Sequence, residues 1–169
     1  MRQTAFFVKG SENIPGCPCC GGQLRYRDSR LRIRKHESGE CDRLSIRRFR
    51  CTACKRYHNE LPDILFPYKH YEAEVISGVI DGIVTPDDQD SEDYPSVSTM
   101  LYWLRWFQMN LANMEGYLRN VGYSILGLGK DFLFSDQSLL ESVRKKYFNW
   151  LEKVIRIIYN SGSFLPAYY

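Results

Sequence analysis

Cys17-Pro-Cys-Cys-Gly-Gly22 and Cys51-Thr-Ala-Cys54 decide how the first third of this chain folds. Two short loops, each with cysteines at a Cys-x-x-Cys spacing, are the usual way in which a small domain binds a tetrahedral metal ion. Zinc takes four soft ligands at about 2.3 Å, and each loop supplies two thiolates while its amides point at the sulfur atoms. The predicted ligands of one structural Zn²⁺ ion are Cys17, Cys20, Cys51 and Cys54.

The second ligand is open to an alternative, because Cys19 stands beside Cys20. We prefer Cys20, since Cys17-x-Cys19 is a tighter and rarer spacing and Gly21 tolerates the positive φ that follows a second ligand. His58 is a further alternative ligand, but we interpret it as a surface residue or a neighbour of the ligands. Redox-active thiols are the competing hypothesis, although thioredoxin-like chemistry needs a βαβ context that this sequence lacks.

The sequence between the loops has the pattern of a long β-hairpin, which explains why 30 residues separate them. In residues 25–35, Leu31 and Ile33 alternate with arginines, so we expect a half-buried strand with a row of guanidinium groups on one face. Residues 37–42 have turn composition, and we interpret Cys41 within them as a free thiol.

A second basic strand is predicted over residues 43–50. Its apolar residues change parity between Ile46 and Phe49, which indicates a β-bulge. The cysteine loops then lie at the far ends of the two strands, which is the plan of a zinc ribbon. We therefore predict a first domain over residues 1–60.

Charge is distributed unevenly along the 169 residues. Residues 1–60 hold 14 Lys and Arg against 6 Asp and Glu, a net charge of +8, whereas residues 61–169 hold 9 against 14, a net charge of −5. Guanidinium groups on a rigid hairpin contact successive phosphates and displace counterions, which gives affinity for nucleic acid without a choice of sequence. The predicted contacts are Arg30, Arg32, Arg34, Arg47, Arg48 and Arg50.

Residues 61–169 have the pattern of a helical domain. Helices are predicted at about 68–84, 96–119 and 135–160, where apolar residues recur at helical spacing. The predicted core stripe of the second helix is Val97, Leu101, Leu104, Leu111 and Leu118, with Met100, Trp103, Phe107 and Met114 alongside. The predicted fold class is therefore α+β, with a small N-terminal zinc-ribbon β-hairpin module followed by an all-α domain.

The first two predicted helices raise the hypothesis of a helix-turn-helix. The residues that would then contact DNA are Ser98, Thr99, Tyr102 and Arg105. The connection between the helices is longer than the usual three or four residues, and residues 70–118 hold one basic residue against nine acids. The alternative is that the second helix belongs to the core, with the acidic residues 85–95 in a solvated loop.

No catalytic motif is found, so we predict that the protein is not an enzyme. Gly122-x4-Gly127 is followed by Leu128 instead of lysine, which excludes a phosphate-binding P-loop. No Gly-x-Ser-x-Gly elbow and no His-Glu-x-x-His helix occurs. The acids of the second part cluster in a loop, whereas a nuclease or transposase core sets its carboxylates on a mixed sheet.

The composition predicts a folded protein of the cytoplasm, located at the nucleoid if it binds DNA. Apolar residues make up 44% of the chain, which is enough to form a core. The first residues have only a short apolar patch, without the features of a signal peptide. No stretch approaches the roughly 18 apolar residues that a membrane span needs.

Six segments of the chain carry a resemblance to a known family. They are Cys17-Pro-Cys-Cys-Gly-Gly-Gln-Leu24, Arg27-Asp-Ser-Arg30, Arg47-Arg-Phe-Arg-Cys-Thr-Ala-Cys-Lys-Arg-Tyr-His58, Glu60-Leu-Pro-Asp-Ile-Leu-Phe-Pro-Tyr68, Pro95-Ser-Val-Ser-Thr99 and Trp103-x-x-Trp106. Together they resemble an uncharacterised bacterial zinc-ribbon family that is similar to the N-terminal zinc-ribbon and helix-turn-helix part of insertion-sequence transposases. The resemblance covers about residues 15–107 and implies a DNA-binding protein associated with a mobile element or transposition, without the catalytic domain.

The sequence thus predicts a non-enzymatic zinc-ribbon protein that binds duplex DNA. The helical domain would supply a second DNA contact, an oligomer interface or a surface for a protein partner. One alternative is a protein–protein adaptor with a structural zinc, whose basic ribbon meets an acidic partner. A second alternative is binding of single-stranded nucleic acid or RNA, with bases stacked on Tyr26, Phe49 or Tyr57.

Overall fold

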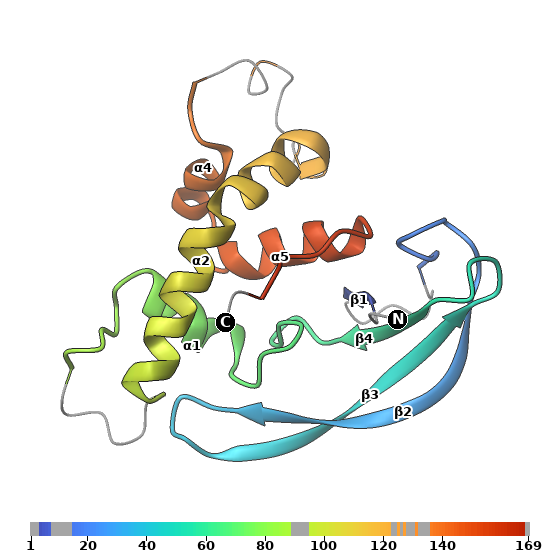
Figure 1. Ribbon diagram of the computed structural model, residues 1–169, viewed down its shortest axis with the longest axis horizontal. Helices are drawn as coiled ribbons and strands as arrows, with labels where there is room; N and C mark the ends of the chain where they lie inside the picture. Colours follow the sequence, from blue (N-terminus) through green and yellow to red (C-terminus); the bar gives the residue numbers. More distant parts are fainter. Residues whose placement is uncertain are drawn as a thin grey trace.

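The structure of the chain is a computed structural model that describes residues 4–7, 15–88, 95–122, 125, 127, 131 and 136–167. It has the predicted α+β class, since a four-stranded sheet at the N-terminus is followed by a helical region (Figure 1). Residues 89–94, which belong to the predicted acidic loop, lie outside the described residues.

The sheet contains the predicted hairpin and two further strands. Its members are β1 (Thr4–Phe7), β2 (Leu24–Lys35), β3 (Cys41–Cys51) and β4 (Tyr57–Leu61), in the order β1-β4-β3-β2. β2 and β3 pair in antiparallel fashion, β4 returns antiparallel to β3, and β1 runs parallel to β4. The turn between β2 and β3 includes Gly39 with φ of 79°, and Cys41 is the first residue of β3 instead of a turn residue.

The β-bulge lies in β2 and not in β3, where it was expected. The register passes from Tyr26 paired with Phe49 to Asp28 paired with Arg48, so Arg27 is the extra residue. An extra residue in one strand increases the local twist of the pair. The twist of the hairpin is visible in Figure 1.

The change of parity in β3 arises because both faces of the sheet are covered. Ile46 belongs to the main core, together with Ala5, Leu61 and the helices. Phe49 belongs to a second cluster, which lies beneath the cysteine loops. That cluster consists of Phe6, Cys17, Leu24, Phe49 and Cys51, with Cys19 against it. β3 therefore buries Ile46 on one face of the sheet and Phe49 on the other.

Arg30 of β2 is exposed as predicted, but from Leu31 onward the exposed face is the opposite of the expected one. Leu31 and Ile33 are 69% and 41% exposed, whereas Arg32 is half-buried. The reason is that the guanidinium group of Arg32 finds acceptors, the carbonyls of Phe66 and Lys69, at 2.9 and 2.7 Å. An arginine can cover apolar surface with its stem while its head is hydrogen-bonded.

The helical region is built from short helices around one long helix. Its elements are α1 (Ala73–Ile80), α2 (Val97–Tyr117), the π-helical turn η1 (Leu118–Gly122), α4 (Leu139–Lys146) and α5 (Trp150–Asn160). The helix predicted over 68–84 is shorter at its start, because Tyr71 and Glu72 form β-bridges with Lys35 and Leu65. Backbone groups paired in this way are not available to a helix.

The helix predicted over 135–160 is two helices. The backbone of Tyr147 is extended, with φ of −124° and ψ of 128°, and it ends α4 before α5 begins. The helix predicted over 96–119 corresponds to α2 with the start of η1.

α2 buries the residues predicted alongside the leucine stripe, not most of the stripe itself. Its buried residues are Met100, Trp103, Trp106, Phe107, Asn110 and Met114. Val97 and Leu101 are 52% and 53% exposed. Leu104 and Leu111 are half-buried, and only Leu118 of the predicted stripe is fully buried. The helix turns its aromatic rings inward because they remove more apolar surface from water than leucine does.

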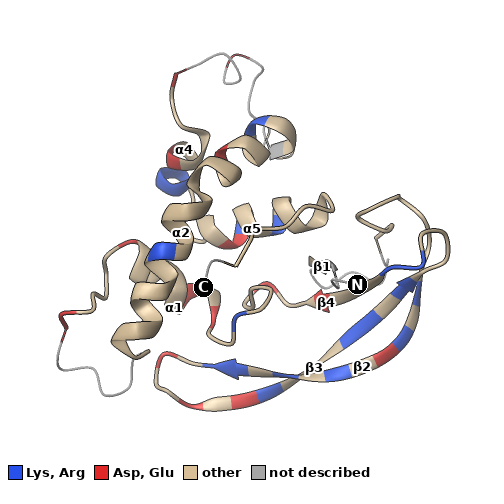
Figure 2. Cartoon of the chain, viewed as in Figure 1, with Lys and Arg blue, Asp and Glu red and all other residues tan. Residues whose placement is uncertain are grey.

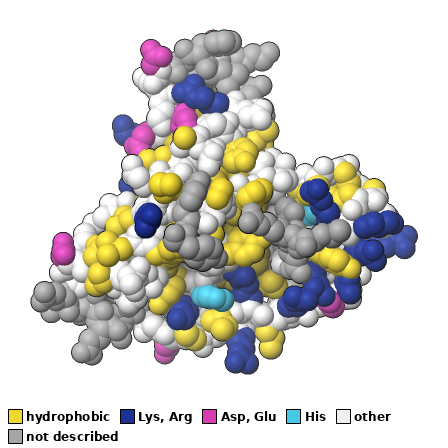
Figure 3. Space-filling view, in the orientation of Figure 1, with side chains coloured by type: hydrophobic (Ala, Val, Ile, Leu, Met, Phe, Trp, Pro, Cys, Tyr) yellow, Lys and Arg dark blue, Asp and Glu magenta, His cyan; other side chains and the backbone are white. Residues whose placement is uncertain are grey.

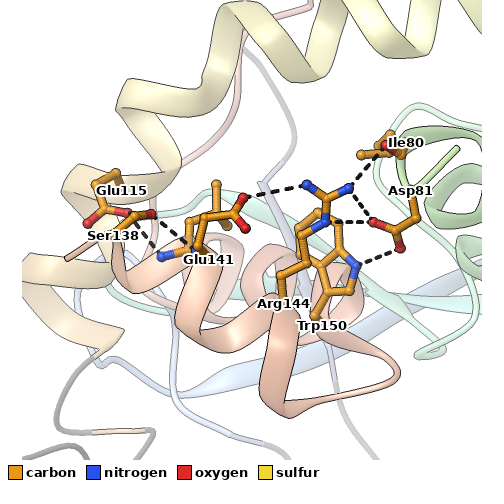
Figure 4. A network of polar contacts seen from close by, with 8 residues as sticks. Ile80, Asp81, Glu115, Ser138, Glu141, Arg144 and Trp150 are labelled. Carbon is orange, nitrogen blue, oxygen red and sulfur yellow. Dashed lines mark hydrogen bonds and ion pairs between the residues drawn. The ribbon is translucent and has the colours of Figure 1, made fainter.

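Glu115 joins α2 to the first turn of α4 (Figure 4). Its carboxylate accepts hydrogen bonds from the amides of Leu139 and Leu140 at 2.9 and 3.0 Å, and from Ser138 Oγ at 2.9 Å. A side chain of one helix thus caps the N-terminus of another, where free amides and the helix dipole favour a negative charge.

Asp81 joins the end of α1 to α4 and α5 (Figure 4). Its carboxylate accepts a hydrogen bond from Arg144 Nε at 2.7 Å and one from Trp150 Nε1 at 3.0 Å. Arg144 also donates to the carbonyl of Ile80 at 3.2 Å. The three short helices are therefore fixed to one another by polar contacts as well as by the core.

The sheet and the helices share the main core, and β1 lies against α5. A domain boundary at residue 60, with domains over 1–60 and 61–169, stays a prediction. The helix-turn-helix is not confirmed, because residues 81–96 separate α1 from α2 and part of this segment lies outside the described residues. In the described part of the chain, no helix is long and apolar enough to cross a bilayer.

Candidate metal centre and basic hairpin

The two cysteine loops have the same backbone arrangement. In each, the amide of the first cysteine donates to the carbonyl five residues later, at 2.8 Å in the first loop and 2.9 Å in the second. The residue after each second cysteine is left-handed, with φ of 70° at Gly21 and 63° at Lys55. The expectation for Gly21 is confirmed, whereas Lys55 adopts this conformation despite its Cβ atom, which is unfavourable.

The loops bring together the sulfur atoms of the four predicted ligands. Cys17 Sγ lies 3.7 Å from Cys54 Sγ, and Cys20 Sγ lies 3.5 Å from Cys51 Sγ. All four sulfur atoms lie within 4.8 Å of one another. A tetrahedron with metal–sulfur bonds of about 2.3 Å has edges of about 3.8 Å, so the spacing suits such an ion. The four cysteines therefore form a potential metal site.

The sulfur atoms differ in how readily they ionise. Burial raises the pKa of Cys17 to about 12, with a further upward contribution from its contacts with Cys54 and Cys20. Burial also acts upward on the pKa of Cys51, but hydrogen bonds from the amides of Cys54 and Ala53 bring it down to about 6. Four thiolates this close would repel one another, so the sulfur atoms keep protons when no cation is bound. Metal binding here would therefore release protons.

His58 and Cys19 lie beside the four sulfur atoms. His58 is fully buried instead of lying at the surface, and its Nε2 atom is 3.3 Å from Cys17 Sγ. Cys19 Sγ accepts a hydrogen bond from Arg56 at 3.4 Å. Cys17, Cys19 and His58 also cluster, but this set offers three ligands, whereas the four cysteines complete a tetrahedron. We therefore place His58 as a neighbour that orients Cys17.

Gly22 allows the two loops to approach each other. A Cβ atom at this position would lie 3.1 Å from Cys51 Sγ, 3.3 Å from Cys20 Sγ and 3.0 Å from the side chain of Ala53. These distances are shorter than ordinary van der Waals contacts. The sequence thus needs glycine here for close approach, in addition to the left-handed glycine before it.

A profile of the family described as Domain of unknown function (DUF6431) matches residues 17–103, just over half of the chain. The chain belongs to this family. The DUF6431 region begins at the first predicted ligand, contains both cysteine loops, the hairpin and α1, and ends within α2. No curated protein and no solved structure matches the chain. The resemblance to insertion-sequence transposases stays a prediction.

Three of the six arginines predicted to contact DNA form ion pairs inside the DUF6431 region. The pairs are Arg34 with Asp42 and Glu72, Arg47 with Glu60, and Arg48 with Asp28. The hydrogen bonds that these arginines donate to Asp42, Glu60 and Asp28 raise the pKa of each arginine above its ordinary value. Arg47 and Arg48 each use two nitrogen atoms, which is the strong bidentate geometry. Arginines bound in this way are less available to a phosphate.

Of the other three, Arg32 is held by backbone carbonyls, and Arg30 and Arg50 are exposed. Within the described residues, neither Arg30 nor Arg50 forms an ion pair. The sequence prediction therefore named arginines in three environments, and Arg30 and Arg50, which are exposed and form no ion pair within the described residues, keep their charge toward solvent.

Tyr57 is the centre of a group of arginines at the end of the hairpin near the cysteines. The Cζ atoms of Arg27, Arg48 and Arg50 lie 4.6, 5.5 and 5.6 Å from the centre of its ring. Arg25 is exposed and pairs with Arg50 across β2 and β3. We name Arg25, Arg27, Arg50 and Tyr57 the Tyr57 cluster. Stacking on the ring restricts the guanidinium groups without neutralising them.

Positive charge is concentrated on the sheet. Lys and Arg recur along β2 and β3 in Figure 2 and are sparser on the helices. The space-filling view shows their side chains gathered over the part of the molecule that holds the sheet (Figure 3). This agrees with the uneven charge of the sequence and places the surface most attractive to an anion on the hairpin.

The predicted DNA contacts in the helical region lie in the first turns of α2. Ser98 and Arg105 are exposed, and Thr99 and Tyr102 are half-buried. The Tyr102 ring is covered on one side by Lys69, whose Nζ atom is 4.4 Å from the ring centre. The role of these residues in contacting DNA stays a prediction.

Proposed function

We propose that this member of the DUF6431 family is a non-enzymatic zinc-ribbon protein that binds duplex DNA. The observation that carries the zinc assignment is the group of four sulfur atoms with separations of 3.5 and 3.7 Å between the close pairs. Thiolate ligands in a tetrahedron are typical of Zn²⁺. Four protein ligands leave no open position on the ion, so its role would be structural.

The Tyr57 cluster supports contact with nucleic acid. Its arginines extend from strands that are joined at one end by the cysteine loops and held at the other by the bridge from Lys35 to Tyr71. Guanidinium groups on so rigid a support lose little freedom when they bind phosphates. We propose that the main contacts are Arg25, Arg30 and Arg50, because Arg27 forms an ion pair with Asp28 at 3.8 Å.

Other parts of the prediction enter this proposal on the sequence alone. These are the association with a mobile element or transposition, a second DNA contact through the start of α2, and a location in the cytoplasm at the nucleoid. The exposed position of Ser98 and Arg105 is compatible with the second contact.

The test is a salt titration of binding to random-sequence duplex DNA, on protein whose zinc content has been measured. Each phosphate contact contributes about 0.9 to the slope of log K against log salt. The double variant Arg25→Gln with Arg50→Gln should bind every duplex more weakly, with a slope smaller by up to about 1.8. The control is Lys145→Gln with Lys146→Gln, which removes the same charge from exposed residues of α4.

An unchanged slope in the arginine variant, or an equal loss in the lysine variant, would move the DNA site away from the Tyr57 cluster. Absence of duplex binding at physiological salt would favour the adaptor hypothesis, in which the basic hairpin meets an acidic protein. Less than one zinc per chain would contradict the metal assignment.

Single-stranded nucleic acid is the second candidate, because Tyr26 is 58% exposed beside the basic strands. Phe49, which the sequence also suggested as a stacking residue, is fully buried and has no face available for a base. Competition between duplex and single-stranded oligonucleotides of the same sequence separates the two candidates. Preference for the single strand that Tyr26→Ala abolishes would support stacking.

A further inference from the structure

A pocket lies where the segment before α1, the first half of α2, α5 and the C-terminal segment meet. Its volume is about 230 Å³, the space of roughly eight molecules of liquid water. Aromatic side chains form much of its wall. They are Phe66, Tyr68, Tyr102, Trp106 and Tyr159. An apolar, concave site with few polar groups is typical of binding sites for small organic molecules.

Tyr68, at the pocket, has a left-handed backbone with φ of 63° and is 63% exposed. A residue with a Cβ atom adopts this conformation only when its surroundings enforce it. Backbone strain of this kind concentrates at ligand sites. The strained residue is thus consistent with a site shaped for a ligand.

Of the described residues that line the pocket, Lys69 is the charged one. It is 8% exposed, and its Nζ atom lies 4.4 Å from the ring centre of Tyr102 and 4.5 Å from that of Trp106. Within the described residues, no carboxylate forms an ion pair with it. Burial lowers its pKa to about 8, so the amine is still mostly protonated near neutral pH. A buried cation without an anion is costly, and two rings offset only part of that cost.

Arg32 adds a second positive charge beside the pocket. It donates to the carbonyls of Phe66 and Lys69, and both residues line the pocket. Among the described residues that line the pocket, none is acidic. Two cations whose charge no described carboxylate at the pocket balances attract an anion, while the aromatic wall favours a flat apolar body.

We propose that this pocket binds a small aromatic carboxylate, with the carboxylate against the Lys69 ammonium group and the ring among the aromatic side chains. The ligand would complete the ion pair that Lys69 lacks within the described residues. This inference does not depend on DNA binding or on the metal.

The test uses the full chain and phenylacetate as the probe, with phenylacetamide as its neutral counterpart of nearly the same shape. Binding is followed by tryptophan fluorescence, because Trp106 lines the pocket, and is checked by calorimetry. Lys69→Met is the test variant. Lys153→Met is its control, because Lys153 makes a similar contact with the ring of Tyr147, at 4.7 Å, outside the pocket. A variant that ends at Ala167 is titrated in parallel, since this residue also lines the pocket.

The expected result is saturable binding of phenylacetate with a dissociation constant of about 1 mM or tighter. Phenylacetamide should bind at least about tenfold more weakly. This comparison of acid and amide uses the natural chain, so it tests the proposal even if Lys69→Met folds poorly. Lys69→Met should lose binding by a similar factor, and Lys153→Met should keep it.

Three results would overturn the proposal. They are no saturable binding to either the full chain or the shortened variant, equal affinity for the acid and the amide, and equal loss in the two lysine variants. The second would mean that the site is only an apolar cavity, and the third that any positive charge on the molecule has the same effect.

Discussion

Replacing Cys20 by serine should weaken zinc binding about 10²- to 10³-fold, whereas Cys19→Ser should change it by less than about twofold. The estimate starts from structural zinc in small domains, which contributes about 10–16 kcal/mol. One of four ligands then accounts for roughly 2.5–4 kcal/mol, and each 1.4 kcal/mol is about a factor of ten. Cys20 Sγ lies 3.5 Å from Cys51 Sγ inside the four-sulfur group, but Cys19 contacts Arg56.

The assay is competition for zinc with a colorimetric chelator, combined with metal content and far-UV circular dichroism before and after chelation. His58→Gln provides an intermediate case, with a loss of about tenfold, because residues that orient a ligand typically contribute 10- to 100-fold to metal affinity. An equal or greater loss in Cys19→Ser than in Cys20→Ser would refute the assignment. The metal would then be held by Cys17, Cys19 and His58 with a further ligand.

Two further predictions concern stability. Glu115→Ala should lower the free energy of unfolding by about 2–4 kcal/mol, because it removes a helix cap and hydrogen bonds to a charged acceptor. Thermal unfolding checks this. The control is Glu141→Ala, at an exposed residue, whose free energy of unfolding should stay within about 0.5 kcal/mol of that of the natural chain. Burial acts upward on the pKa of Glu115, but its hydrogen bonds from Leu140, Leu139 and Ser138 hold it below the ordinary value of 4.5. The stabilisation is therefore complete above that value and is lost as the pH falls through the lowered folded pKa, so Glu115→Ala should be less sensitive to acid than the natural chain. Lys55→Gly should raise stability by about 1 kcal/mol in urea unfolding, because glycine relieves the left-handed conformation, and a loss of stability would contradict that conformation.

The parts of the fold that depend on local spacing could be predicted from the sequence. The two Cys-x-x-Cys loops, the hairpin between them and the positive φ of Gly21 depend on residues within a few positions of one another. The structure brings the four cysteines together as expected. The helix bounds were less accurate, because the bridges of Tyr71 and Glu72 and the break at Tyr147 involve partners or backbone angles that apolar periodicity does not report.

The parts that depend on distant partners could not be predicted. The pattern of β2 does not reveal that carbonyls more than 30 residues away would hold Arg32, and so it suggested the wrong exposed face. The Tyr57 cluster could be predicted in part, since pairing the predicted strands places Arg25 beside Arg50. The pocket around Lys69 was not, because widely separated segments form it.

The position of β1 shows that the segment matched by the family profile is smaller than the unit that folds. β1 precedes the residues that the family profile matches, yet Ala5 enters the main core and Phe6 enters the cluster under the cysteines. A fragment trimmed to residues 17–103 would leave the backbone of β4 unsatisfied along one edge and strip α4 and α5 from the core. The ends of recombinant fragments from this family should therefore be chosen from tertiary packing, because the segment that matches the family profile lacks part of the core.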